Sequence, residues 1–382
     1  MLHKPQDDEE QYLNLGEELN LRKKLHQTSV LERIGELRAP GPAPAPWVVE
    51  LDPTTACNLA CPDCISRDLL NQGGFERERL RDLAREMVDA GVRAVVLIGG
   101  GEPLAHPEAE WVIRYFGENG LQIGVTTNGT LIDRHMDCLA EHASWVRVSV
   151  DAASSETFQH FRPSPKGVSE FDKVIDNMRA FARRKRGKLG YSFLMLTECD
   201  REGRVLRSNI PEIYTGALLA RDIGCDYFEV KPSFDFNHFL IGQPDALLNQ
   251  AKEQINAIEH LQTESFRSLT ATKTRFVLDN DVQSQPKDYH DCTVAKLRTL
   301  LTPSGAYVCP YFRGVATKQI GDVTKQSFTE MWHGAQRAAV MEKLDPSKDC
   351  RFHCIRHESN LMLEEMLKSL PEHGGPDYDF FI

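Results

Sequence analysis

Three cysteines stand close together near the start of the chain, at Cys57, Cys61 and Cys64. They form a C-x3-C-x2-C pattern just after the apolar stretch Trp47 to Leu51, which reads as a β-strand. A closed tetrahedral zinc site needs a fourth protein ligand, and this loop offers none. A [4Fe-4S] cluster held by three cysteines instead leaves one iron open to a ligand that does not come from the protein. The spacing therefore favours iron-sulfur chemistry at an open iron.

A glycine-rich turn, Gly99-Gly100-Gly101-Glu102-Pro103, follows the next apolar strand. Glycine lets the backbone approach a ligand closely and expose its carbonyl groups. Most such runs are plain tight turns, but downstream of the cysteine triad the pattern resembles the radical S-adenosylmethionine (radical SAM) superfamily, over roughly Trp47 to Phe234. The competing interpretation of the triad is a structural zinc knuckle or a set of free thiols.

The resemblance implies a cofactor and the residues that contact it. SAM would chelate the open iron through its amine and carboxylate, and an electron from the cluster would cleave it to methionine and a 5′-deoxyadenosyl radical. The turn containing Gly100, Gly101 and Glu102 would receive the amino group of the methionine moiety. Ser149 and Asp151 would contact the SAM ribose and carboxylate or the substrate, the alternative for Asp151 being a helix cap.

Four more cysteines, Cys292, Cys309, Cys350 and Cys354, gather in the C-terminal part of the chain. Two bracket a hairpin-like run with a Pro-Ser-Gly turn, and two lie close together after a predicted helix. Four thiolates can hold either an iron-sulfur cluster or a structural zinc ion. Beside a radical SAM core they resemble the auxiliary-cluster domain called twitch, the shortened relative of the SPASM domain. That resemblance implies a second, auxiliary [4Fe-4S] cluster acting as an electron relay.

Strands and helices alternate from Trp47 onward, the pattern of βα units around a parallel sheet. Strands are expected at residues 48–52, 94–98, 122–126, 145–150, 191–196 and 227–231, and helices at 76–90, 107–119, 133–142, 169–184 and 210–223. Six repeats predict an α/β fold, a partial (β/α)6 barrel. We divide the chain into an N-terminal helical extension with a proline-rich linker (1–46), the barrel (47–280) and a small cysteine-rich auxiliary-cluster domain with a C-terminal helix (281–382).

In α/β barrels the chemistry lies beyond the carboxyl ends of the strands, so residues that follow strands are candidates. Asn128 is a candidate cofactor contact, with a simple turn as the alternative. Cys199 is expected near the barrel mouth, where a thiol would give a hydrogen atom to a substrate radical, unless it is a small buried hydrophobe. Lys231 closes the sixth predicted strand and is a candidate substrate contact or proton acceptor, with a surface lysine as the alternative.

The composition limits the classes of partner. Among 382 residues, 45 are Lys or Arg and 56 are Asp or Glu, for a net charge of −11. An acidic chain is poorly suited to sequence-independent binding of nucleic acid. No apolar run approaches the ~20 residues of a membrane-spanning helix, and the acidic N-terminus does not read as a signal peptide. We therefore expect a cytoplasmic protein whose cysteines serve metal or redox chemistry.

These observations predict a radical SAM enzyme of the oxidoreductase or epimerase type. Our first hypothesis is that it abstracts hydrogen from a carbohydrate-like or other small polyhydroxylated metabolite, leading to dehydrogenation, epimerisation or decarboxylation. The second is a maturase or epimerase that acts on a ribosomally made peptide, and the third is a non-catalytic iron-sulfur or zinc scaffold. Activation of a sulfatase ranks lower, because that branch carries a longer cysteine set. An enzyme of this type needs an electron donor such as flavodoxin or ferredoxin.

Overall fold

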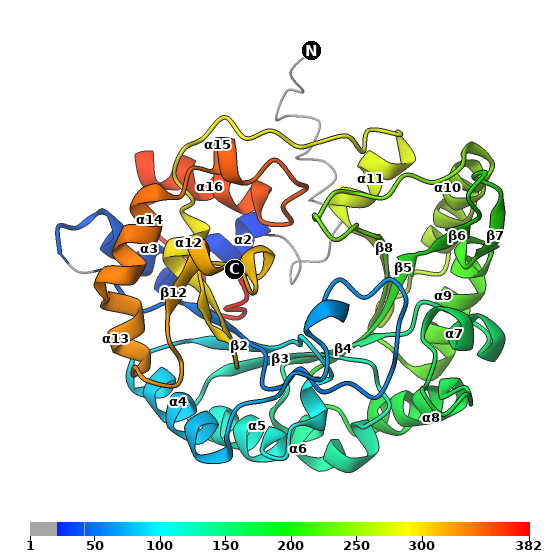
Figure 1. Ribbon diagram of the computed structural model, residues 1–382, viewed down its shortest axis with the longest axis horizontal. Helices are drawn as coiled ribbons and strands as arrows, with labels where there is room; N and C mark the ends of the chain where they lie inside the picture. Colours follow the sequence, from blue (N-terminus) through cyan, green and yellow to red (C-terminus); the bar gives the residue numbers. More distant parts are fainter. Residues whose placement is uncertain (1–20, 42) are drawn as a thin grey trace.

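The structure, a computed structural model, describes residues 21–41 and 43–382. Its main feature is a curved ten-stranded sheet in the order β12-β11-β10-β1-β2-β3-β4-β5-β8-β9 (Figure 1). From β10 to β9 all neighbouring strands run parallel. The strands are β1 (Val48–Leu51), β2 (Ala94–Leu97), β3 (Gln122–Thr127), β4 (Trp145–Ser149), β5 (Lys188–Met195), β8 (Tyr227–Pro232), β9 (Arg267–Thr270), β10 (Arg298–Thr302), β11 (Gly305–Tyr307) and β12 (Gln319–Gly321).

Helices cover the convex face of this sheet, as expected for a partial barrel (Figure 1). They are α4 (Arg77–Asp89), α5 (Ala109–Glu118), α6 (Met136–His142), α8 (Phe171–Ala182), α9 (Ile213–Ile223) and α10 (Asp245–Glu259). The predicted fold class is confirmed, and all six predicted strands form. Sequence analysis missed the short helix α7 (Ser155–Phe161), helix α10 and the edge strand β9.

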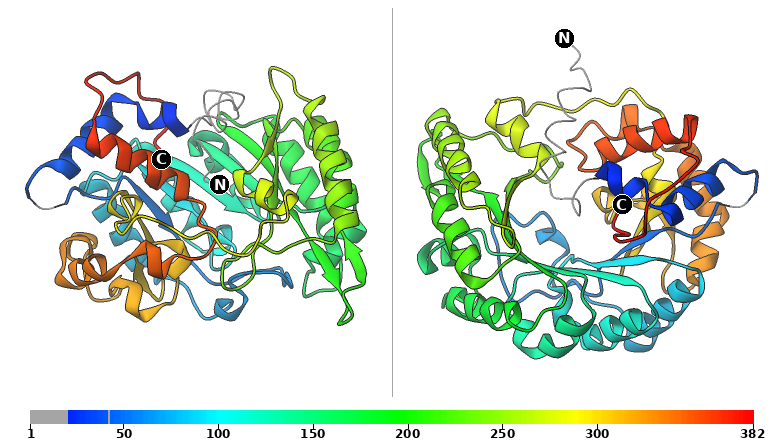
Figure 2. Two further views of the ribbon diagram at one scale, coloured as in Figure 1. Left: turned by 90° about the horizontal axis from the view of Figure 1, so that it is seen from above. Right: turned by 180° about the vertical axis from the view of Figure 1, so that it is seen from behind.

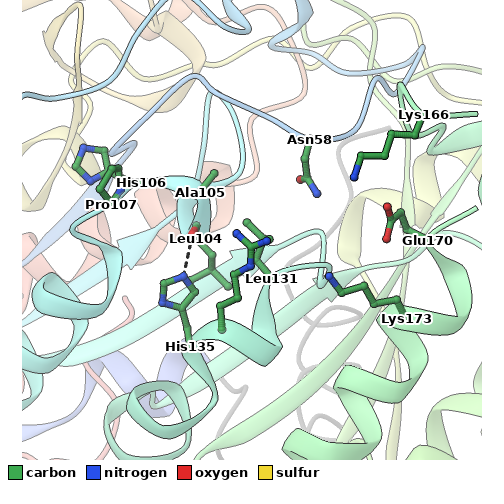
Figure 3. A pocket seen from close by; sticks show the side chains of 11 residues that line it. Asn58, Leu104, Ala105, His106, Pro107, Leu131, His135, Lys166, Glu170 and Lys173 are labelled. Atoms are coloured by element: carbon green, nitrogen blue, oxygen red, sulfur yellow. Dashed lines mark hydrogen bonds between the residues drawn. The ribbon is translucent and has the colours of Figure 1, made fainter. Parts of the chain in front are cut away.

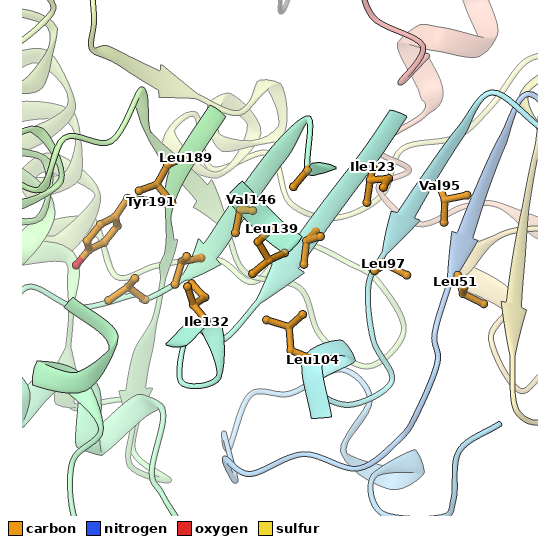
Figure 4. Close-up of a cluster of buried hydrophobic side chains, with 14 of the residues drawn as sticks. Leu51, Val95, Leu97, Leu104, Ile123, Ile132, Leu139, Val146, Leu189 and Tyr191 are labelled. Carbon is orange, nitrogen blue, oxygen red and sulfur yellow. The ribbon is translucent and has the colours of Figure 1, made fainter. Parts of the chain in front are cut away.

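The main hydrophobic core lies between the sheet and these helices (Figure 4). Side chains alternate along each strand, so Val146 and Val148 of β4 are fully buried in this core. The alternating residues of β4, Trp145, Arg147 and Ser149, point to the concave face and are only partly buried. The same alternation places Gly190 and Ser192 of β5 and Glu229 and Lys231 of β8 on the concave face.

A second core covers part of the concave face. Helices α2 (Leu21–Leu25), α3 (Thr28–Arg38), α12 (Val294–Leu297) and α16 (His357–Lys368) pack there with the C-terminal tail (Figures 1 and 2). Phe380 meets Trp47 edge-on at 5.4 Å between ring centroids, and Phe381 meets Trp145 at 5.3 Å. The described part of the predicted N-terminal helical extension therefore forms two helices that pack on the barrel, while residues 1–20 of that extension lie outside the described residues.

The C-terminal cysteine-rich segment is continuous with the barrel sheet. β10 pairs parallel with β1, in a register that sets Val48 opposite Arg298 and Leu51 opposite Leu301. The predicted hairpin then continues antiparallel into β11 and β12. Its turn uses Gly305 at φ 151°, a backbone conformation that favours glycine. Helices α11 (Thr272–Leu278), α13 (Phe328–His333), α14 (Ala335–Lys343) and α15 (Pro346–Asp349) complete the described segment.

Among the described residues, no helix combines the length and the apolar character that crossing a membrane requires.

Candidate active site

The loop after β1 brings the three N-terminal cysteines into one neighbourhood. Burial raises the pKa of the Cys61 thiol to about 11, and the nearby thiols of Cys64 and Cys57 raise it further while Arg162 opposes the shift. Burial also raises the pKa of Cys57, with Cys64 again contributing. All three side chains are partly buried. Within residues 21–41 and 43–382 no three His, Cys, Asp or Glu side chains are close enough to hold a single metal ion.

The glycine turn after β2 packs directly against this loop. Gly101 N donates to Thr54 O at 3.2 Å, and Glu102 N donates to Ala56 O at 2.8 Å. A Cβ on Gly101 would lie 2.3 Å from Ala56 O, so only glycine fits between the two segments. Gly100 differs, because its Cβ would meet the Thr55 side chain at 3.4 Å, an ordinary contact. The turn therefore fixes the backbone of the cysteine loop through residue 101 and leaves space at residue 100.

The Glu102 carboxylate is buried and fully engaged with the protein. One oxygen accepts hydrogen bonds from Thr127 Oγ1 at 2.7 Å and Leu104 N at 3.1 Å, and the other accepts from Asn128 N at 2.7 Å. Burial raises the pKa of this carboxyl group. Glu102 thus joins the end of β2 to the end of β3. The predicted contact of Glu102 with the cofactor stays a prediction, and these hydrogen bonds give the carboxylate a structural role as well.

Asn128 joins the same region to the cysteine loop. Its Nδ2 donates to Asn58 Oδ1 at 2.9 Å, and Asn58 Nδ2 donates to Thr130 Oγ1 at 2.7 Å. The Asn128 amide oxygen accepts from Thr130 N at 3.0 Å, the local pattern of an Asx turn. The turn that sequence analysis gave as the alternative is therefore present, and its amide also holds Asn58 between the first two cysteines.

Asp151 lies beyond β4, with a left-handed backbone at φ 57° and a side chain that is 1% exposed. One carboxylate oxygen accepts from Arg162 Nε at 2.8 Å, and the other accepts from Leu194 N at 2.7 Å. Arg162 Nη1 in turn lies 3.9 Å from Cys61 Sγ. Asp151 and Cys61 raise the pKa of Arg162 despite its burial. Asp151 thus orients a cation beside the cysteine loop.

Ser149 and Lys231 both lie on the concave face, near the carboxyl ends of β4 and β8. Ser149 pairs with Ser192 of β5, and Ser192 pairs with Glu229 of β8. Lys231 Nζ stands 3.9 Å from Glu229 Oε2. Burial and the nearby Arg147 lower the pKa of Lys231 to about 8, with Glu229 opposing. Lys231 is therefore a partly buried amine that changes protonation near neutral pH.

Cys199 lies on a hairpin formed by β6 (Thr197–Cys199) and β7 (Val205–Ser208), which leaves the main sheet after β5. Its side chain is exposed to solvent, whereas sequence analysis expected a thiol near the barrel mouth that could serve a substrate radical. An exposed thiol is a poor hydrogen donor to a radical that must be shielded from water. Cys138 and Cys225 are buried on the helix side, as small core residues.

The four C-terminal cysteines also converge. Burial raises the pKa of Cys309, and Cys354, Cys292 and Cys350 raise it further. Asn360 Nδ2 donates to Cys292 Sγ at 3.4 Å, and the Arg356 backbone N–H donates to Cys354 Sγ at 3.3 Å. Four thiols from separate segments thus share one partly buried site, with two hydrogen-bond donors aimed at sulfur.

Comparisons with known proteins address the barrel. Residues 51–207 match the radical SAM superfamily. This segment is a radical SAM domain. The AdoMet-dependent heme synthase of Methanosarcina barkeri (strain Fusaro / DSM 804) is 24% identical over 335 residues, covering 81% of this chain and 88% of that protein. The mycofactocin maturase MftC of Mycobacterium tuberculosis (strain CDC 1551 / Oshkosh) is 27% identical over 273 residues, covering 70% of this chain and 65% of that protein.

Solved structures share the fold. Streptococcus suis SuiB bound to the precursor peptide SuiA aligns with a TM-score of 0.57 and 16% identity, covering 81% of this chain and 70% of that chain. The enzyme anSMEcpe with bound AdoMet and a peptide aligns with a TM-score of 0.56 and 13% identity, covering 85% of this chain and 99% of that chain. A radical SAM domain implies SAM and a [4Fe-4S] cluster.

A cavity of about 140 Å³ adjoins the glycine turn of the radical SAM domain. Its lining residues include Gly100, Thr55, Asp52 and Arg313. Arg313 Nε donates to Asp52 Oδ2 at 2.6 Å, which ties the segment after Cys309 to the end of β1. The two cysteine groups are therefore linked through a buried ion pair.

A larger cavity of about 480 Å³ is lined in part by Asn58 of the cysteine loop (Figure 3). Its apolar residues include Leu104 and Leu131, and Asn58 of the cysteine loop stands at its edge. Lys166 and Lys173 line it beside Glu170. A group of cations thus stands next to the cysteine loop on a chain whose net charge is −11.

Sequence analysis missed Arg162, Arg313 and Ser192. Arg162 reaches Cys61 across 101 sequence positions, and Arg313 reaches Asp52 across 261. No local spacing shows such contacts, because they depend on the order of the strands in the sheet. Ser192 could have been found, since it occupies a concave-face position by the alternation of the apolar run around Tyr191.

Proposed function

We propose that this protein is a catalytic radical SAM enzyme in which Cys57, Cys61 and Cys64 hold a [4Fe-4S] cluster. The single observation that carries this proposal is a set of three convergent thiols on a loop pinned by the Gly101 turn. When bound, the cluster supplies an electron that cleaves SAM and yields a 5′-deoxyadenosyl radical. Arg162 at 3.9 Å from Cys61 Sγ fits an anionic thiolate group.

We assign the residues around the cluster to two tasks. Gly100 borders a cavity and has space beside it, so its backbone is suited to receive the amino acid part of SAM. Ser149 offers a hydroxyl on the concave face. Glu102, Asn128 and Asp151 use their polar atoms on neighbouring residues and position the site. We therefore expect Glu102, Asn128 and Asp151 to affect the reaction by holding the site in its geometry.

We further propose that Cys292, Cys309, Cys350 and Cys354 hold an auxiliary [4Fe-4S] cluster. The Asn360 amide and the Arg356 backbone N–H already donate to two of these sulfurs. Buried Lys287 is close enough to Cys354 and Cys350 for their charges to affect its pKa. Hydrogen bonds and positive charge near a cluster raise its reduction potential. A structural zinc ion is the competing occupant, and metal analysis separates the two.

For the substrate we favour a carbohydrate-like or other small polyhydroxylated metabolite, changed by dehydrogenation, epimerisation or decarboxylation. The supporting observation is the polar concave face, where Thr126, Ser149 and Ser192 present hydroxyl groups beside Glu229 and Lys231. Hydroxyl-rich molecules need several such partners when they leave water. The relatives are named for different products, so their names do not favour one substrate class over another.

A peptide is the second candidate substrate. The similar SuiB structure is bound to a precursor peptide. Large apolar side chains are exposed on several loops of this chain. Among them are Ile65 at 51%, Phe236 at 46% and Ile355 at 51% exposure. Arg67 stands over the Phe236 ring at 3.9 Å, which joins two of these loops. Exposed apolar patches of this kind serve protein or peptide contacts.

The reaction needs a one-electron donor, and we propose an acidic carrier such as flavodoxin or ferredoxin. The cation-lined cavity beside Asn58 supports this, because it lies next to the cysteine loop (Figure 3). Opposite charge steers such transient encounters. Lys166 and Lys173 are the side chains best placed to meet acidic groups of the carrier.

Anaerobic reconstitution with iron and sulfide tests the proposal. We expect about eight irons per chain, from two four-iron clusters, and formation of 5′-deoxyadenosine from SAM with dithionite as reductant. Cys57→Ala should abolish SAM cleavage and keep about four irons, and Cys309→Ala should likewise keep about four. A protein that holds only zinc, or a loaded protein that never turns over SAM, would support the scaffold hypothesis instead.

A further inference from the structure

The concave face of β4, β5 and β8 carries a row of polar side chains. The strand register sets Arg147 beside Thr126, Ser149 beside Ser192, and Ser192 beside Glu229. Their neighbours Val146 and Val148 are buried on the helix side, so Arg147 points to the concave side. The exposed fractions are 27% for Arg147, 19% for Glu229 and 20% for Lys231, so this part of the face remains open to solvent.

The charges in this row do not balance. Arg147 Nη1 lies 3.5 Å from Glu229 Oε2, and Lys231 Nζ lies 3.9 Å from the same oxygen. Two cations therefore share one carboxylate oxygen. Asp151 is the other acid that influences Lys231, but Arg162 and the Leu194 N–H already hold its two oxygens. Among residues 21–41 and 43–382, one positive charge in this group is therefore left without its own counter-charge.

Two polar groups in the row also lack partners. Ser192 is 1% exposed, and its hydroxyl makes no hydrogen bond within the part of the chain that the structure describes. Arg147 Nε is buried and equally unpartnered among those residues, although Nη2 donates to Thr126 Oγ1 at 3.3 Å. Buried polar groups in folded proteins almost always find a partner. The unused donors therefore point to a ligand that supplies acceptors.

Aromatic rings border the row. The Tyr227 ring leans over Gly190, where a Cβ would lie 2.1 Å from it, and the Trp145 ring leans over Gly124 in the same way. The Arg147 guanidinium carbon lies 5.8 Å from the centroid of the Trp145 ring. Flat apolar surface beside excess positive charge suits the body of a small molecule that ends in an anionic group.

We propose that Arg147, Lys231 and Ser192 bind a carboxylate or phosphate group of the substrate. This inference rests on the proposed function and adds a required anionic group to the substrate class. The oxyanion would supply the acceptors that Ser192 Oγ and Arg147 Nε lack, and would balance the excess charge. Arg147 and Lys231 are positioning residues in this proposal, because they hold the substrate at a distance from the reacting carbon.

The test measures binding of inorganic phosphate and, separately, acetate to the anaerobically reconstituted enzyme with SAM at saturation, by isothermal titration calorimetry. Lys231→Met and Arg147→Gln should each weaken the binding about tenfold to a hundredfold, the effect of losing a charged hydrogen-bond partner. Lys231→Arg should restore most of it. Lys252→Met, on the exposed face of α10, is the matched control and should bind like the wild type. Tighter binding of one probe identifies the preferred oxyanion.

The pH dependence provides an independent readout. Lys231 titrates at a pKa of about 8 in the presence of Arg147, Glu229, Asp151 and Arg162. Acetate keeps its charge above about pH 6, so its affinity should fall as the pH rises through about 8 in the wild type but not in Lys231→Arg.

Three results would overturn the inference. They are no detectable binding of either probe, equal affinity in Lys231→Met and wild type, and competition between phosphate and SAM, which would assign these cations to the cofactor. Iron content and 5′-deoxyadenosine formation, measured on the same wild-type sample without added anion, report on the proposed function separately. A sample that cleaves SAM but binds neither anion keeps the proposed function and loses this inference.

Discussion

Replacing Gly101 by alanine should release iron from one site and spare the other. The added Cβ would lie 2.3 Å from Ala56 O and 2.6 Å from Thr55 O, both backbone atoms of the cysteine loop. Carbon and oxygen that are not bonded rarely approach closer than about 3.3 Å, so the loop must move by about 1 Å. Overpacking of this kind costs about 1–3 kcal/mol, and a displacement of about 1 Å at a reacting centre can cost about 100-fold in rate.

Gly101→Ala should therefore retain about four irons per chain after reconstitution, against about eight in the wild type, because the C-terminal cysteines are untouched. Iron and sulfide analysis with the visible spectrum gives the count, and release of 5′-deoxyadenosine gives the rate. Gly35→Ala is the matched control, since its Cβ would meet Leu370 at an ordinary 3.5 Å. Full iron content and a rate within about twofold of wild type in Gly101→Ala would refute the packing argument.

Three further predictions follow from other contacts. Arg162→Ala leaves the buried Asp151 carboxylate without its cation and should destabilise the fold by about 3–5 kcal/mol in chemical denaturation; equal stability would contradict the pairing. Burial alone would raise the pKa of Glu50, but its arginine partners lower it. The ion pairing of Glu50 with these arginines stabilises the fold above about pH 4.3, and this contribution is lost as the pH falls through the lowered pKa of Glu50. The difference in unfolding free energy between wild type and Glu50→Gln should therefore become smaller in acid, as measured by circular dichroism. Lys166→Glu combined with Lys173→Glu should lower the ratio of flavodoxin-driven to dithionite-driven SAM cleavage about tenfold at low salt, and an unchanged ratio would place the carrier elsewhere.

The fold was predictable because its signals are local. The apolar runs at β1 to β5 and β8 alternate with amphipathic helices, and each run predicts its own strand without knowledge of its neighbours. The spacing of Cys57, Cys61 and Cys64 is local in the same sense. β9 was missed because the run Arg267–Thr270 is short and has a single apolar residue, Leu269, and its place is set by pairing with β8.

The candidate site was less predictable because its contacts cross the sheet. Glu102 occupies the motif position that the resemblance assigns to SAM, but its hydrogen bonds to Thr127 and the Asn128 N–H were not predictable from the motif. Cys199 follows a strand, as a residue at a barrel mouth does, but the chain turns there into an exposed hairpin. The position of a residue at the end of a strand can be predicted from the sequence, whereas the direction of its side chain depends on segments distant in the sequence that pack against it.

The parallel pairing of β10 with β1 makes the chain hard to divide. A truncation after residue 280 would turn β1 from an interior strand into an open edge, with unpaired backbone groups along Val48–Leu51. It would also leave the buried carboxylates of Asp52 and Glu50 without their arginine partners, because Arg313 and Arg298 come from the removed segment. The segments that carry the two cysteine groups are attached to one continuous sheet, the first after β1 and Cys309 after β11. The spacing between the two proposed metal sites is therefore set by the sheet and does not depend on a hinge or linker.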